Sequence, residues 1–114
     1  MNEYMKVQIK RAKLIYKQLL KMYPDIKKIP LEFVNLKGKS GGYLETYKIG
    51  NKNIPIQIVL DNSGLYSTDP DYVICHEFAH LILCIRKNNL AHSKVHSNLT
   101  NKLANKFNCN SSEK

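Results

Sequence analysis

The 114-residue sequence predicts a single small α+β domain, built from a helix, three strands and two further helices. Three observations support this class. An amphipathic helical pattern opens the chain, three short runs rich in β-branched residues lie between residues 31 and 60, and a strongly apolar helical pattern begins at residue 70. We expect the domain to cover residues 1–108 and residues 109–114 to form a loose tail.

The first element is predicted to be a helix from Glu3 to Met22, which Pro24 ends. Its lysines stand largely between the apolar positions and predict a solvated face. The apolar positions that recur at helical spacing are Met5, Ile9, Ala12, Tyr16, Leu19 and Tyr23, and the intervening lysines are Lys6, Lys10, Lys13, Lys17 and Lys21.

The next region is predicted to form a three-stranded antiparallel sheet. The expected strands are Leu31 to Leu36, Tyr43 to Ile49 and Ile54 to Leu60. Gly41-Gly42 and Gly50-Asn51 mark the turns between them. Since proline cannot donate a hydrogen bond to a neighbouring strand, Pro55 is expected at a strand start or a sheet edge.

Two helices follow the sheet. Asp69 is predicted to be an N-cap with Pro70 at the first helical position, and the helix then runs to about Lys87. Its apolar stripe predicts the central buried helix of the domain: Ile74, Phe78, Leu81 and Ile85. Asn88-Asn89 ends this helix, and Ser93 is expected to cap a last helix that carries Leu99, Leu103 and Phe107 on one face.

The composition indicates which cellular compartment and which class of partner to expect. A formal net charge of +9 favours an acidic partner, nucleic acid first, although a bias toward Lys, Asn and Ile from an AT-rich genome explains the same excess. No apolar run approaches the roughly 18 residues of a membrane span. The N-terminus also lacks the continuous apolar stretch of a signal peptide. We therefore expect a cytoplasmic monomer without a membrane partner.

The segment from His76 to His80 has the pattern His-Glu-x-x-His. Residues four apart on a helix lie on one face, so both imidazoles can reach one Zn²⁺ ion. Glu77 lies beside them and can accept a proton from water activated by that ion. All four histidines of the chain fall between positions 76 and 96, which further favours a metal site.

A catalytic zinc ion needs a third protein ligand and one open position. No Asp or Glu occurs between Leu81 and Ser112, so a downstream carboxylate ligand is nearly excluded. Cys84 shares the helical face but lies about 12 Å along the axis from His76. An extended return of the chain after Asn88-Asn89 would bring His92 to the site, whereas a helical return would bring His96. We favour His92, with His96 as the alternate third ligand.

These features together resemble the SprT-like zinc metallopeptidases, the superfamily that includes the Spartan DNA–protein crosslink proteases. The resemblance covers residues 31 to 107 and is carried by Gly42-Tyr43-Leu44, the strand up to Leu60, the motif His76-Glu77-Phe78-Ala79-His80 and the segment Ala91-His92-Ser93-Lys94. Ser93 stands where that family often has Gly, His96 stands near its usual aromatic residue, and no zinc ribbon follows. The resemblance implies a small zincin-like domain, with peptidase activity and an association with DNA.

The predicted function is zinc-dependent hydrolysis of peptide bonds in a protein or peptide substrate. His76, His80 and His92 would hold Zn²⁺, and Glu77 would be the general base. The candidates for a donor that stabilises the oxyanion are Tyr43, Tyr47, Tyr66, Tyr72 and the histidine that is not a ligand.

Two alternatives compete with this prediction. The first is an ImmA-like regulatory peptidase of mobile elements, because the segment from Leu103 to Phe107 resembles the A-N-x-F segment of that family. Its acidic ligand is absent here, with Asn101 near that place. The second alternative is a non-catalytic basic DNA-binding module with a structural metal site.

Overall fold

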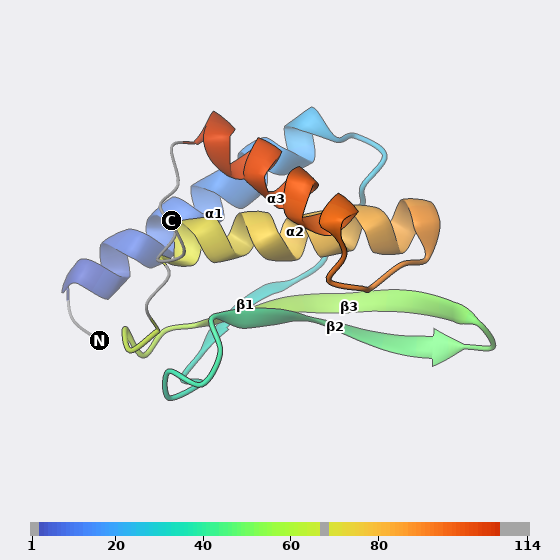
Figure 1. Ribbon diagram of the computed structural model, residues 1–114. Helices are drawn as coiled ribbons and strands as arrows, with labels where there is room; N and C mark the ends of the chain where they lie inside the picture. Colours follow the sequence, from blue (N-terminus) through green and yellow to red (C-terminus); the bar gives the residue numbers. More distant parts are fainter. Residues whose placement is uncertain (1–2, 67–68, 108–114) are drawn as a thin grey trace.

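The computed structural model describes residues 3–66 and 69–107, and the predicted loose tail at 109–114 lies outside these residues. The described residues form helix α1 (Glu3–Met22), strands β1 (Leu31–Val34), β2 (Gly42–Ile49) and β3 (Lys52–Asp61), and helices α2 (Pro70–Lys87) and α3 (Lys94–Lys106). All three helices lie on one face of the sheet (Figure 1). The predicted α+β class is confirmed, and the predicted bounds of α1 and α2 agree with the structure.

The sheet is mixed, so the prediction that it is entirely antiparallel was wrong. Its strand order is β1-β3-β2, with β2 antiparallel and β1 parallel to β3. The chain reverses between β1 and β2 and again between β2 and β3, so β3 runs in the same direction as β1. Because β3 takes the central position, those two strands become parallel neighbours.

Strand β3 occupies the centre because its second half is the most apolar stretch of the sheet. Ile58 and Leu60 are fully buried, and β1 pairs only with the part of β3 that starts at Ile58. Pro55 lies before that part, opposite Thr46, next to a register shift that marks a β-bulge. Its missing N–H therefore falls where β3 has no β1 neighbour, which agrees with the expected edge position.

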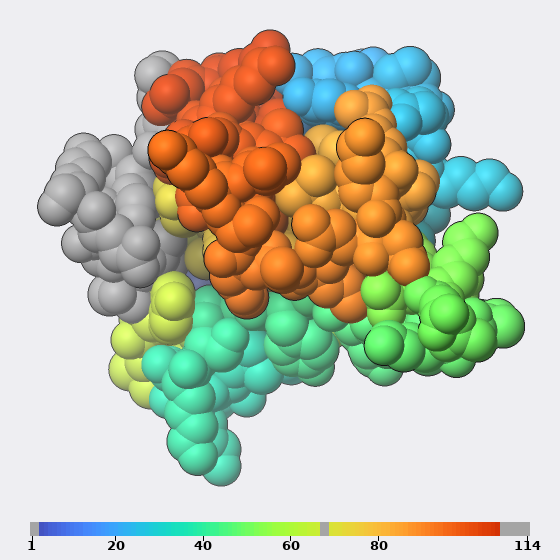
Figure 2. Space-filling model, turned by 45° about the vertical axis from the view of Figure 1, so that its right-hand side comes forward, coloured from blue at the N-terminus to red at the C-terminus, as the bar shows by residue number. Residues whose placement is uncertain are grey.

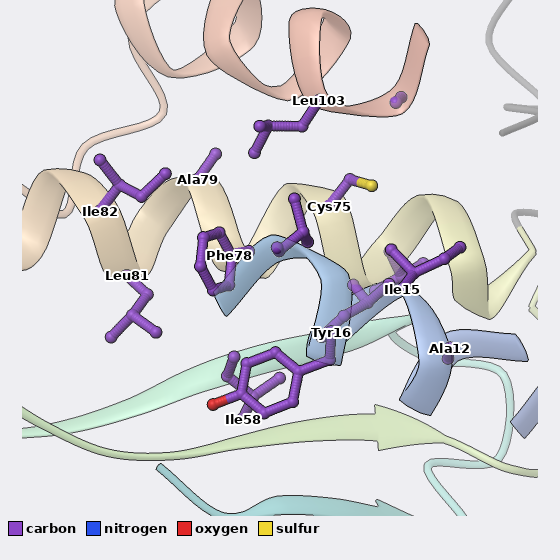
Figure 3. Packing of buried hydrophobic residues seen from close by; sticks show 14 of the residues in the cluster. Ala12, Ile15, Tyr16, Ile58, Cys75, Phe78, Ala79, Leu81, Ile82 and Leu103 are labelled. Carbon is purple, nitrogen blue, oxygen red and sulfur yellow. The ribbon is translucent and has the colours of Figure 1, made fainter. Parts of the chain in front are cut away.

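The core lies between the helices and the sheet, around the apolar side of α2. Phe78 is fully buried and contacts the Tyr16 ring edge-on, with 6.0 Å between ring centroids. Leu103 brings α3 to the same core from above α2, and Ile58 closes it from the sheet (Figure 3). The Tyr16 hydroxyl donates to the carbonyl of Ile29 at 2.8 Å, which satisfies its polar group inside the core. This packing fixes α2 in the middle of the domain.

The ends of α2 differ from each other in how they are capped. Asp69 occupies the N-cap position as predicted, but its side chain makes no capping hydrogen bond and instead accepts from the Tyr4 hydroxyl at 3.0 Å. At the other end Asn88 adopts the left-handed conformation, with φ of 52°, and its backbone N–H donates to the carbonyls of Leu83 and Cys84.

Among the described residues, no helix is long and apolar enough to cross a membrane.

Candidate metal centre

Helix α2 presents two histidines of the motif on the side that faces away from the core residue Phe78. His76 and His80 stand one helical turn apart, and their ring centroids are separated by 5.0 Å. His80 is buried, whereas the side chain of His76 is 31% exposed. The helical spacing therefore brings both rings to one place, as the sequence predicts.

The segment after α2 carries His92 back to these two rings. Asn88 turns the chain and also holds the β2–β3 hairpin, since its Oδ1 accepts from the Asn53 backbone N–H at 2.7 Å. The chain then runs without helix to Ser93, the N-cap of α3. In the space-filling view this segment lies over β2 (Figure 2). Nε2 of His92 ends 3.1 Å from Nε2 of His80.

The three histidines lie close enough together to hold a metal ion. One ring nitrogen from each of His76, His80 and His92 lies within 4.8 Å of the other two. Two imidazole nitrogens on a tetrahedral zinc ion are about 3.3 Å apart, as Zn–N bonds of about 2.0–2.1 Å require. The measured 3.1 Å between His80 and His92 is close to this value. Three neutral imidazoles are also a donor set that suits zinc, so the residues fit such an ion.

His96 does not join this group of three. It is 1% exposed, and its Nε2 lies 3.0 Å from the backbone carbonyl oxygen of His76. Its ring stacks on the ring of His80 at 3.7 Å between centroids. The structure thus brings His92 into the group that could hold a metal ion and places His96 behind the motif, inside the protein.

The electrostatic surroundings keep the two motif histidines neutral. Burial lowers the pKa of His76 to about 4, with a further lowering from His96 and His92. Burial also lowers the pKa of His80 to about 3, and the neighbouring His96 and His76 act in the same direction. At neutral pH both rings therefore offer free nitrogen lone pairs, which is the form that binds a metal ion.

Glu77 is a buried carboxyl group beside the ligands. It is 3% exposed, and its Oε2 lies 3.9 Å from Nε2 of His76. Burial raises the pKa of Glu77 to about 8, although a backbone hydrogen bond from Leu44 acts in the opposite direction. A cation bound by the histidines would favour the ionised carboxylate. The position of Glu77 therefore suits a proton acceptor next to a bound ion.

A cleft of about 490 Å³ opens onto these residues, between α2, the start of β2 and the segment before α3. His76, Glu77, His80 and His92 form part of its lining. The start of β2 approaches α2 closely here, since a Cβ at Gly42 would lie 3.2 Å from the Val73 side chain. The three histidines and Glu77 thus share one cleft.

Three of the four predicted tyrosine candidates line this cleft: Tyr43, Tyr66 and Tyr72. Tyr47 is not among its lining residues. Ser40 and Leu90 also line the cleft, and the sequence offered no signal for either, since both are isolated residues in loops. Cys84 is not in the group of three or among the lining residues, and its thiol donates to the carbonyl of Asn53 at 3.5 Å.

No protein-family model, curated protein or solved structure matches this chain. The resemblance to the SprT-like metallopeptidases therefore rests on the residues themselves. Its sharpest part is the motif from His76 to His80, followed by the segment around His92. What these residues form is a cluster of three histidines able to hold a metal ion, beside a buried carboxyl group in an open cleft.

Proposed function

We propose that this protein is a zinc-dependent metallopeptidase. One observation carries the proposal: ring nitrogens of His76, His80 and His92 lie within 4.8 Å of one another on the wall of a cleft that Glu77 also lines. A general base placed next to a metal-binding group is the arrangement that metal-assisted hydrolysis of an amide uses.

The number and exposure of the ligands favour a catalytic ion over a structural one. Structural zinc sites are closed by four protein ligands, whereas catalytic sites keep one position open. Within the described residues the group has three members, and His92 is exposed at the cleft. The fourth position would therefore face the substrate.

The chemistry divides between the ion and the chain. When bound, Zn²⁺ acts as a Lewis acid, which lowers the pKa of a water molecule and polarises a carbonyl group. Glu77 takes a proton from the attacking water at its carboxylate and returns it to the leaving amine. Its burial excludes competing solvent and keeps the carboxylate directed at the same place through both transfers. Tyr43, Tyr66 and Tyr72 are the cleft hydroxyls available to stabilise the oxyanion.

The position of β2 supports a peptide as the substrate. Strand β2 lies at an edge of the sheet, and its residues Gly42, Tyr43 and Leu44 line the cleft beside His76 and Glu77. An exposed edge binds an extended peptide by adding it as a further strand. A peptide held along β2 would run past the three histidines with its carbonyl groups exposed to them.

The experiment that tests this proposal compares wild type with Glu77→Gln. The amide keeps the size of the side chain but cannot accept the proton, so cleavage of casein or of a disordered basic protein should fall by about 10²–10⁴-fold. Zinc content should stay the same, because the ligands are the histidines. Glu32→Gln, at an exposed carboxylate on β1, is the matched control and should behave as wild type.

The outcomes separate the alternatives. Equal cleavage by wild type and by zinc-loaded Glu77→Gln would exclude Glu77 as the base. If the zinc-loaded wild type cleaves no member of a broad peptide library, the peptidase proposal is wrong and a non-catalytic metal-binding module replaces it.

A further inference from the structure

His96 is the histidine that the proposed chemistry leaves without a role, yet it is the most buried of the four. It is 1% exposed and lies in the first turn of α3, where its backbone N–H donates to the N-cap hydroxyl of Ser93 at 3.3 Å. Burial of a polar ring is unfavourable unless its nitrogens are hydrogen-bonded. The partner of this ring therefore indicates what the residue does.

That partner is the backbone of the metal-binding motif. Nε2 of His96 lies 3.0 Å from the carbonyl oxygen of His76, and since a carbonyl only accepts, Nε2 carries the hydrogen and donates. In an α-helix this carbonyl also accepts from the N–H four residues later, which belongs to His80. His96 is thus hydrogen-bonded to the backbone of the helical turn that carries His76 and His80.

The ring of His96 also contacts both ligand rings. It stacks on His80 with 3.7 Å between centroids and 18° between planes, and it meets His76 edge-on at 4.5 Å. A flat surface behind His80 restricts the rotation of that imidazole. Its counterpart in the cleft is His92, whose Nε2 faces Nε2 of His80. His80 therefore contacts His96 through the face of its ring and His92 through its ring nitrogen.

Helix α3 holds His96 rigidly enough for this task. Thr100, one turn later and 2% exposed, donates its hydroxyl to the His96 carbonyl at 2.9 Å, and Leu103 anchors the same helix in the core. The N-cap Ser93, which directly follows His92, belongs to the same first turn. One helix end thus supports all three ligands: it contacts two of them and begins next to the third.

We propose that His96 is a positioning residue of the metal centre, which preorganises His76, His80 and His92 by donating to the His76 carbonyl and stacking on the His80 ring. This inference rests on the proposed metal site. It predicts that metal affinity depends on the donor at position 96, because supporting partners of metal ligands typically contribute 10–100-fold to affinity.

The test measures metal binding by the full chain, without reference to cleavage. Apo protein is titrated with Co²⁺, whose visible absorption reports coordination geometry, and Zn²⁺ affinity is obtained by competition. His96→Phe keeps a flat ring but removes the donor, and its affinity should fall by about 10–100-fold with an altered Co²⁺ spectrum. His96→Gln restores an N–H donor without the stacked ring and should recover part of the affinity. His96→Leu, which also lacks the donor, replaces His96→Phe if that variant does not fold.

Ile15→Val is the matched control, because it removes one buried methyl group from α1 in the same core and leaves α3 intact. It should lower thermal stability and leave metal affinity unchanged. The inference is overturned if the donor-less variant binds metal as wild type does, if His96→Gln binds as weakly as that variant, or if Ile15→Val loses affinity equally. A wild type that binds no metal would overturn the proposed function together with this inference.

Discussion

Helix α2 buries two carboxyl groups less than two turns apart, and the two differ in whether a basic side chain is paired with them. Asp71 is 5% exposed and accepts from the Arg11 guanidinium at 2.7 Å. Glu77 is 3% exposed, and in the part of the chain that the structure describes no Lys or Arg is paired with it. Arg11 also donates to the Phe107 carbonyl at 2.8 Å, so its pairing with Asp71 ties α1 to α2 and to the end of α3.

This difference distinguishes a structural charge from a functional one. A buried carboxylate costs free energy unless a cation and hydrogen bonds compensate it. The chain supplies the cation for Asp71 from its own Arg11. For Glu77 it supplies three histidines, which bring positive charge beside the carboxyl group when they bind a metal ion. The first arrangement stabilises the fold, whereas the second leaves a site that a cation completes.

The largest effect that would test this comparison is on stability. Arg11→Ala leaves Asp71 buried without its cation, so we expect the free energy of unfolding to fall by about 2–3 kcal/mol, less than for a fully buried pair because Arg11 is partly exposed. Zinc affinity should not change. The check is urea denaturation alongside a zinc titration. A loss of stability below about 0.5 kcal/mol would show that the Asp71 pair is not the structural contact described here.

A second effect should appear in the pH dependence of the metal-free protein. The folded pKa of Glu77, about 8, lies above its ordinary value of 4.5, so its contribution is fully present below pH 4.5 and is lost as pH rises through 8. Glu77→Gln removes this loss. Apo Glu77→Gln should therefore gain stability relative to apo wild type as pH rises from 5 to 9. Parallel stability curves for the two proteins across this range would contradict the uncompensated burial of Glu77.

The elements with local signals were predictable from the sequence. Proline and helical spacing set the limits of α1 and α2, and Ser93 capped α3 as expected. The order of the sheet was not predictable in the same way, because the pairing of β1 with β3 joins residues that are far apart in the chain. Strand runs alone do not say which strand takes the centre.

The grouping of the histidines at the site was predictable from the sequence, but the contacts that support them were not. Helical spacing brings His76 to His80, and the length of the return after Asn88 favours His92. The contact of His96 with a backbone carbonyl depends on where a side chain points after two helices have packed, which no spacing reveals. The pairing of Arg11 with Asp71 spans 60 residues for the same reason. The lysines of α1 are exposed, and their contact with nucleic acid stays a prediction.

The central claim is that three histidines of this chain hold one metal ion, and elemental analysis of the purified protein tests it most directly. Wild type should carry about one Zn²⁺ per chain. His80→Ala and His92→Ala should each retain little of it, while Arg11→Ala, which alters the structural pair on the same helix, should retain all of it. Full zinc occupancy in both histidine variants, or none in a wild type purified without chelator and offered zinc, would contradict the account.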